Sequence, residues 1–184
     1  MFIYFLYYFI CISFLKAVWC QREMGPGLWS VKNVKQCPDP EQYEIQVTME
    51  RRKYNRTHDC FDWDLCLPDP LDENYGMLAE VYKLCDGGYK FQQNIDDAYA
   101  CKFVEDNSKD NLDAITNLAG VEPGCPFPKG CYNIENFLVD YEDLPENCVY
   151  GEFLILGYLI KNEVKMSCIS LELECEEKEK ESSF

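Results

Sequence analysis

The sequence has little of what catalysis usually requires. Histidine occurs once among 184 residues, as His58 in the polar sequence Asn-Arg-Thr-His-Asp-Cys, which is typical of a surface loop. Ser-His-Asp and Cys-His mechanisms need a histidine as general base, and zinc sites commonly use histidine or paired cysteine ligands. The chain also lacks the GxSxG, HExxH and glycine-rich phosphate-binding motifs. We therefore predict that the protein is not an enzyme and has no catalytic residue, metal site or cofactor.

Positive charge is also scarce. The chain has 17 lysines and arginines against 33 aspartates and glutamates, which gives a formal net charge of −16. Such a charge disfavours nucleic acid as a partner, and it disfavours anionic membranes as purely electrostatic partners. Part of it is local, because glutamates crowd the C-terminal end at Glu172, Glu174, Glu176, Glu177, Glu179 and Glu181. Residues 176–184 are accordingly predicted to form a solvated acidic tail.

Long apolar runs are absent except at the N-terminus. The first 19 residues, MFIYFLYYFICISFLKAVW, carry a single charge, at Lys16. A run of this kind at the start of a chain is typical of a secretory signal peptide, which we assign to residues 1–20. A membrane anchor is the alternative, since the run approaches the length that spans a bilayer. With the signal removed, we expect a soluble chain without a transmembrane anchor, either extracellular or lysosomal.

Cysteine, in contrast, is abundant. The chain has 12 cysteines, of which Cys11 and Cys20 fall within the predicted signal peptide. The even number that remains is typical of a disulfide framework formed in an oxidising compartment. Asn55, followed by Arg56 and Thr57, forms a sequon for N-glycosylation, which requires the same secretory route. Together these signals predict a secreted, disulfide-rich glycoprotein that is modified at Asn55.

Residues 21–175 have the length of one domain, and no linker divides them. Within them, short apolar stretches alternate with clusters of proline, glycine and aspartate. We predict strands at 31–36, 43–49, 61–67 and 77–84, the last followed by an Asp-Gly hairpin turn at 86–87. Short strands punctuated by turns in this way indicate an all-β sandwich.

Two other stretches have a different character. Residues 21–30 have the composition of a loose lead-in to the first strand, and the residues from 50 to 59 form a polar segment. Leu112, Ile115 and Leu118 recur at helical spacing, and Gly120 follows them as a stop signal. We therefore predict one short helix at an edge of the sandwich.

Residues 153–160, FLILGYLI, are apolar on both sides of a predicted strand. Successive strand side chains alternate between faces, so Phe153, Ile155 and Leu159 point one way and the apolar residues between them point the other. An antiparallel sheet usually has one solvated face. This strand is therefore either buried between layers, or it lines an apolar cavity with one of its faces.

Several motifs around this strand resemble those of the ML lipid-recognition family. They are CPFPKGCYNI at 125–134, LVDYEDLP at 138–145, Gly151 and KMSCISLELE at 165–174, with GGYK at 87–90 and ACKF at 100–103 further upstream. The set is most similar to the ganglioside-activator-like branch and its secreted invertebrate members, and it covers residues 85–175. The resemblance implies an immunoglobulin-like sandwich of two antiparallel sheets that open like a cup. It also implies a lipid-binding or lipid-transfer function without catalysis.

The resemblance also implies particular site residues. The residues expected to line the lipid cavity are Phe127, Tyr132, Phe137, Phe153, Ile155, Leu159, Ile169 and Leu171. The expected disulfides are Cys37–Cys168 and Cys101–Cys125, while three more bridges among Cys60, Cys66, Cys85, Cys131, Cys148 and Cys175 stay unassigned. The basic cluster of Arg51, Arg52, Lys53 and Arg56 is either a solvated segment or a head-group contact at the rim.

A second hypothesis comes from another class of protein. Aromatic side chains near the two-faced strand are also consistent with an ordinary core that leaves no cavity. The protein would then be a secreted, disulfide-rich interaction protein with a filled core, a protein partner and no lipid cargo. The two hypotheses differ in whether space remains between the sheets, because filled cores leave few voids larger than a water molecule.

Overall fold

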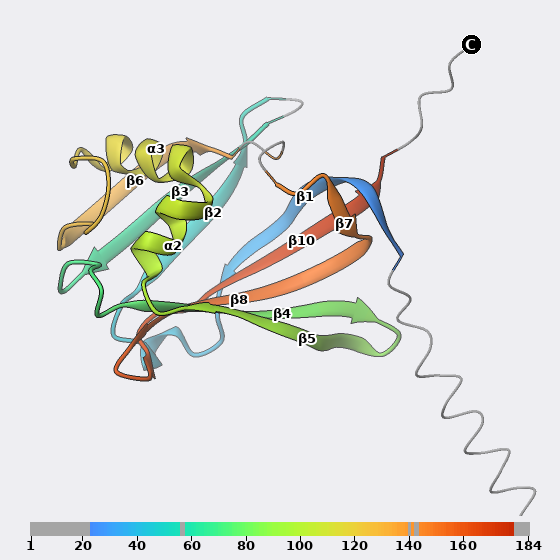
Figure 1. The fold of residues 1–184 in the computed structure, drawn as a ribbon, viewed down its shortest axis with the longest axis horizontal. Helices are drawn as coiled ribbons and strands as arrows, with labels where there is room; N and C mark the ends of the chain where they lie inside the picture. The colour runs from blue at the N-terminus through green and yellow to red at the C-terminus, as the bar shows by residue number, and fades with distance from the viewer. Residues whose placement is uncertain (1–22, 56–57, 140, 142–143, 179–184) are drawn as a thin grey trace, which may run out of the picture.

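The computed structural model describes residues 23–55, 58–139, 141 and 144–178, so the predicted signal peptide lies outside the described residues. It confirms an all-β, disulfide-rich sandwich of antiparallel sheets. The large sheet has seven strands in the order β5-β4-β8-β10-β1-β7, with β9 paired to β8, and the small sheet has the order β2-β3-β6. In Figure 1 the small sheet lies at the upper left beside two helices, and the large sheet fans out below and to the right.

The elements have the following bounds. The large sheet contains β1 (Met24–Gln36), β4 (Gly76–Cys85), β5 (Gly88–Asp97), β7 (Asn147–Val149), β8 (Gly151–Lys161), β9 (Val164–Lys165) and β10 (Ile169–Glu177). The small sheet contains β2 (Val47–Lys53), β3 (Asp59–Leu67) and β6 (Gly130–Leu138). The helical segments are η1 (Pro40–Gln42), α2 (Ala100–Asn107) and α3 (Lys109–Ala119). The strands predicted at 61–67 and 77–84 correspond to β3 and β4, and the turn at 86–87 joins β4 to β5 as predicted.

The prediction of a single helix is wrong, because two consecutive helices meet at Ser108. The second, α3, is the predicted helix, and it ends at Gly120, whose left-handed φ of 70° suits a glycine. Leu112 is buried and Ile115 half-buried, but Leu118 is exposed. The first helix, α2, contains Cys101 and Phe103, for which the sequence indicated only a helical turn related to the predicted helix. Its apolar positions are too few to show a helical period of their own.

The prediction of a loose lead-in at 21–30 is also wrong, since β1 begins at Met24. Its first residues pair with β7, and the strand then continues along β10. Gly27 is buried there, and a Cβ on it would collide with both sulfurs of the Cys148–Cys175 disulfide. The glycine therefore marks a close approach of the strand to a disulfide rather than a flexible segment.

The predicted strand at 43–49 is shifted towards the C-terminus in the structure. Residues 43–46 are irregular, and β2 runs from Val47 to Lys53, so part of the supposed polar segment is strand. The predicted alternation nevertheless holds, because Ile45 is buried and Val47 and Met49 are half-buried. The same period of two continues to Arg51, which is also half-buried.

Four disulfides join described residues, and two of them are the predicted Cys37–Cys168 and Cys101–Cys125. The other two are Cys66–Cys131 and Cys148–Cys175, which the sequence left unassigned. Cys85 is also disulfide-bonded. The prediction that Cys60 forms a bridge is wrong, since its thiol is free and buried. Its neighbours across β2 and β6 are Arg52 and Leu138, which offer no cysteine to pair with.

The described chain ends close to the predicted domain boundary. Glu176 and Glu177 belong to the last strand rather than to the acidic tail, and residues 179–184 lie outside the described part. Across the ranges that the structure describes, no helix combines the length and apolar character needed to cross a bilayer.

Candidate functional site

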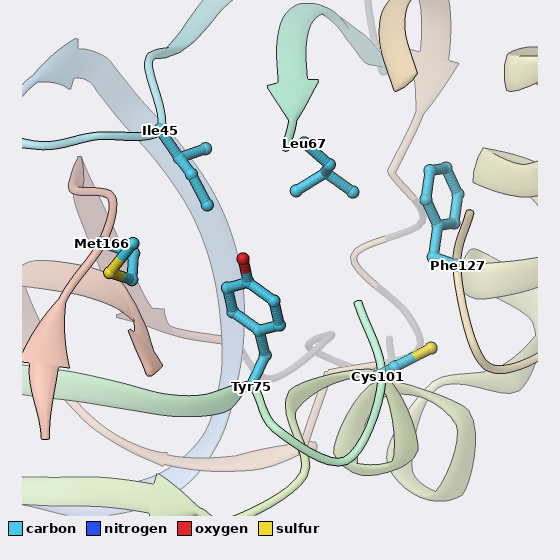
Figure 2. Close-up of a cluster of buried hydrophobic side chains, with 6 residues drawn as sticks. All are labelled: Ile45, Leu67, Tyr75, Cys101, Phe127 and Met166. Atoms are coloured by element: carbon cyan, nitrogen blue, oxygen red, sulfur yellow. The ribbon is translucent and has the colours of Figure 1, made fainter. Parts of the chain in front are cut away.

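Two buried apolar clusters lie between the layers and join the sheets. The first cluster contains Ile45, Leu67, Tyr75, Cys101, Phe127 and Met166, shown in Figure 2. The second cluster contains Val31, Phe61, Ile134 and Phe137. Half-buried side chains from both sheets pack against each cluster, as does Ile115 of α3. The clusters therefore fix the separation of the sheets at two places and close one edge with the helix.

The strand register shows which side chains of the large sheet face the small one. Leu159 of β8 packs against the first cluster and Leu173 of β10 against the second. Leu173 pairs directly with Phe153, and Leu171 pairs with Ile155, and directly opposite residues project to the same face of a sheet. We call the side of the large sheet that carries these residues the inner face.

Between the two clusters, the inner face carries an apolar midsection of Ala79, Ile155, Gly157, Ile169 and Leu171. Phe153 and Leu159 bracket it on β8, and six residues of strand span about 20 Å. None of these five residues is buried; each is only half-buried, although they lie on the face that meets the other layer. Apolar side chains in a filled core are normally buried completely. Leu154 and Leu156 on the opposite face of β8 are half-buried to the same degree, and Val81, which pairs with Ile155, is buried. The midsection is therefore less completely covered than the two clusters.

Gly157 is the position of the midsection that carries no side chain. It pairs with Ala79 on one side and Ile169 on the other, so two neighbouring positions of the inner face have little or no side chain. A Cβ added to Gly157 would meet only Ile169, at 3.4 Å from its Cγ2 and 4.0 Å from its carbonyl oxygen. Both are ordinary van der Waals distances, so a Cβ fits at this position without displacing its neighbours.

The predicted cavity residues therefore divide into two sets. Five of them share the inner face of the large sheet: Phe153, Ile155, Leu159, Ile169 and Leu171. Phe127 and Phe137 are instead buried in the first and second clusters, and Tyr132 packs against both, with its ring centroid 4.8 Å from that of Phe127. These three side chains fill the core at the ends of the interlayer space rather than lining its middle.

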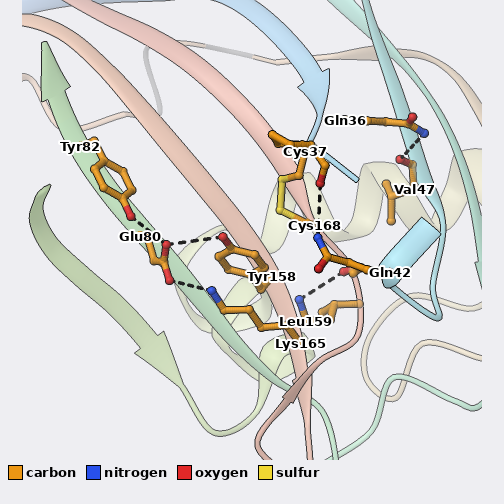
Figure 3. The surroundings of a disulfide bond; sticks show 12 residues. Gln36, Cys37, Gln42, Val47, Glu80, Tyr82, Tyr158, Leu159, Lys165 and Cys168 are labelled. Carbon is orange, nitrogen blue, oxygen red and sulfur yellow. Dashed lines mark hydrogen bonds and ion pairs between the residues drawn. A yellow bond between two sulfur atoms is a disulfide. The ribbon is translucent and has the colours of Figure 1, made fainter. Parts of the chain in front are cut away.

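The opposite, outer face of β8 is apolar because another segment of the chain packs against it. Tyr158 is buried there in a third cluster with Cys37 and Cys168, and Tyr43 packs against it. Figure 3 shows that the disulfide holds the segment after β1 against this face. The strand is thus covered around Tyr158 by the chain on its outer side. That its inner face lines an apolar cavity stays a prediction.

A polar network flanks Tyr158 on this outer face. Glu80 accepts hydrogen bonds from Lys165 at 2.7 Å, from Tyr82 at 3.0 Å and from Tyr158 at 3.5 Å (Figure 3). The hydrogen bond from Lys165 is the main reason that the pKa of Glu80 lies below its ordinary value. Lys165 Nζ also lies 3.5 Å from the centroid of the Tyr158 ring. The network stabilises the outer face and does not reach the midsection.

The inner face of the small sheet becomes polar towards the β2–β3 hairpin. Arg51 donates to Asp59 Oδ2 at 2.8 Å, and Lys53 Nζ lies 3.1 Å from Asp59 Oδ1. Tyr141 donates to the same carboxylate at 3.3 Å. Burial alone would raise the pKa of Asp59, but the hydrogen bonds from Arg51 and Lys53 outweigh burial, so the pKa is lowered. Arg52, on the other face, pairs with Asp62.

A pocket of about 290 Å³ lies beside this polar group, where β1 passes β2. Its lining consists of Lys32, Asn33, Val34, Met49, Glu50 and Arg51. Pockets of about 460 Å³ near Tyr99 and Pro126, and of about 400 Å³ near Trp29 and Leu144, lie elsewhere. None of the eight predicted cavity residues lines any of these pockets.

The residues considered for catalysis, glycosylation and metal binding lie apart from the midsection. His58 and Asn55 are both exposed in the β2–β3 hairpin, where Asn55 Oδ1 accepts a hydrogen bond from the His58 amide at 2.8 Å. Within the described residues, no group of three or more histidine, cysteine or acidic side chains is placed to hold a metal ion.

Comparison with known proteins identifies no family for this chain. It matches no protein-family model, and no curated protein matches it significantly. The site is therefore defined by its own geometry. Sequence reasoning missed Gly157, and it named Arg51 only as one member of a basic cluster that was either solvated or a head-group contact. The period of two that begins at Val47 would have placed Arg51 on the inner face, but nothing in the sequence marks Gly157 as part of the site.

Proposed function

We propose that this protein binds a lipid, or another apolar small molecule, between its two sheets. The observation that supports this proposal is the half-buried apolar midsection between two well-packed clusters. Burying an acyl chain against Ile155, Ile169 and Leu171 would gain about 0.8 kcal/mol for each methylene group removed from water. Such a site needs no bond making or breaking, so the proposed role is that of a non-catalytic carrier or activator.

We further propose that the chain is a secreted member of the ML family. The two disulfides that the resemblance implied, Cys37–Cys168 and Cys101–Cys125, are both present and support this proposal. The disulfide-rich framework also supports an oxidising compartment, either extracellular or lysosomal, and is compatible with glycosylation at Asn55.

Native mass spectrometry of the secreted protein, before and after denaturation, tests the proposed function. We expect a bound species that is released on unfolding and that fragments as a lipid. A clean apo mass that stays unchanged after incubation with fatty acids, sterols and glycolipids would contradict the proposal. That second result would favour an interaction protein whose midsection closes in solution.

A further inference from the structure

A charged side chain points towards the interlayer space where the inner face of the small sheet changes from apolar to polar. Arg51 follows Val47 and Met49 at the strand period of two, and all three are half-buried. Its partner across β3 is Phe61, a member of the second cluster. Directly paired residues share a face of the sheet, so the Arg51 side chain lies on the side that meets the large sheet.

The hydrogen bonds of Arg51 are incomplete. Its guanidinium donates to Asp59 at 2.8 Å and to the carbonyl oxygen of Lys32 at 3.3 Å. A bulge in β1 between Val31 and Asn33 brings that carbonyl oxygen within reach of the guanidinium. The Arg51 Nε atom is buried and has no hydrogen-bond partner among the residues that the structure describes. Buried donors in native proteins almost always have a partner, so Nε offers a place for an acceptor from outside the chain.

The charge around Arg51 favours one negative group. Arg51 and Lys53 together oppose the single carboxylate of Asp59, which leaves one positive charge. Of the other charged residues that line the pocket, Lys32 is paired with Glu174, and Glu50 is an exposed carboxylate whose repulsion of an anion is screened by solvent. A multiply charged head group would meet repulsion from a chain of net charge −16.

The pocket beside Arg51 is next to the apolar midsection. Val34 and Met49 line the pocket together with Arg51, and both pack against the second cluster. Val34 pairs in register with Leu171, which belongs to the midsection. An apolar chain lying against Leu171 therefore needs to pass only Val34 to bring its end into the pocket.

We propose that the ligand is a single-chain lipid carrying one carboxylate, of which a fatty acid is the simplest case. The tail lies on the midsection, and Arg51 Nε donates a hydrogen bond to the carboxylate in the pocket of about 290 Å³. A hydrogen bond between charged groups is stronger than one to a neutral acceptor. This inference rests on the proposed function and narrows it to a class of ligand.

The test compares hexadecanoic acid with 1-hexadecanol, which has the same tail and no charge. Dissociation constants are measured at neutral pH by displacement of an uncharged fluorescent probe. In the wild-type protein we expect the acid to bind about tenfold or more tightly than the alcohol. In Arg51→Gln that ratio should fall to near one, while the affinity for the alcohol stays unchanged.

The adjacent Arg52 provides a matched control. Arg52→Gln removes the same charge from the same strand, but on the outer face. This variant should therefore keep the wild-type preference in affinity for the acid over the alcohol. If Arg51→Gln leaves Asp59 with too few partners and fails to fold, the double variant Arg51→Gln/Asp59→Asn removes both charges of the ion pair. This double variant should also bind the acid and the alcohol with about equal affinity. Equal binding of acid and alcohol by the wild type, or a ratio retained in the Arg51 variants, would overturn the inference but leave lipid binding intact. Failure to bind either molecule or any other lipid would overturn the proposed function itself.

Discussion

A larger side chain at Gly157 distinguishes the two hypotheses, a lipid carrier with space between its sheets and an interaction protein with a filled core. Gly157 lies in the middle of β8 on the inner face, and its backbone is that of an ordinary strand, so any side chain is sterically allowed. Leucine is the informative substitution, because it extends from a Cβ position that has only ordinary contacts with Ile169. Gly157→Leu should therefore place an apolar group in the interlayer space proposed for the ligand.

The sign of the stability change depends on whether that space exists. Fully burying a leucine side chain contributes about 1.5–3 kcal/mol, and replacing a glycine within a strand adds about 0.5–1 kcal/mol. Partial burial would reduce the first figure, so we expect a net stabilisation of about 1–2 kcal/mol. Forcing the same side chain into a filled core would instead destabilise the protein by about 1–3 kcal/mol.

Urea unfolding and binding of a fluorescent fatty acid measure the two consequences. Gly157→Leu should raise the unfolding midpoint and lower lipid affinity at the same time. Ser170→Leu is the control, because Ser170 pairs with Leu156 on the outer face, where an added side chain leaves lipid binding unchanged. A destabilised Gly157→Leu protein that binds lipid as the wild type does would refute the assignment of the midsection as the site.

Three further predictions concern stability. Replacing both Cys37 and Cys168 by alanine opens a loop of 131 residues, and the chain-entropy model predicts that the free energy of unfolding falls by about 5 kcal/mol. Urea unfolding measures this change, and a decrease below about 1 kcal/mol would contradict the prediction. Phe137→Ala should cost about 3–5 kcal/mol by the same assay, because it leaves a void in the second cluster, and a near-neutral result would show that this cluster is not packed. The hydrogen bond from Lys165 is the main reason that the pKa of Glu80 is lower in the folded than in the unfolded protein. Glu80 therefore adds to the free energy of unfolding above its unfolded pKa of about 4, and this stabilisation is lost as the pH falls through the lower folded pKa. Glu80→Gln should therefore flatten the pH dependence of the melting temperature in that acidic range, and an unchanged profile would exclude Glu80 as its source.

The sequence predicts most strands because their signals are local. The alternation through Val47 and Met49, and the Asp-Gly turn at 86–87, depend only on neighbouring residues, and both features are present in the structure. The start of β1 was missed because Gly25 and Gly27 are typical of loops. Their place in a strand follows from contact with Tyr150 and with the Cys148–Cys175 disulfide, which are distant in the sequence.

The candidate site is predictable only in part for a related reason. Strand periodicity correctly places Phe153, Ile155 and Leu159 on one face, since it needs only the alternation of side chains. It does not reveal that Phe127 and Phe137 fill the ends of the interlayer space, because that depends on how far apart the sheets stand. Cluster packing sets this separation, and no single segment encodes it.

The placement of the disulfides bears on how a ligand could enter. Cys66–Cys131 joins neighbouring strands of the small sheet, and Cys148–Cys175 joins two strands of the large sheet. Cys37–Cys168 connects the end of β1 to the start of β10, and Cys101–Cys125 ties α2 to the loop before β6. None of these four described disulfides joins a strand of one sheet to a strand of the other. The sheets are held together by the apolar clusters and by hydrogen bonds such as those from Arg51 to the Lys32 carbonyl oxygen and from Gln36 to the Val47 carbonyl oxygen. All of these contacts can separate without covalent change, so this framework allows the interlayer space to open for the proposed ligand.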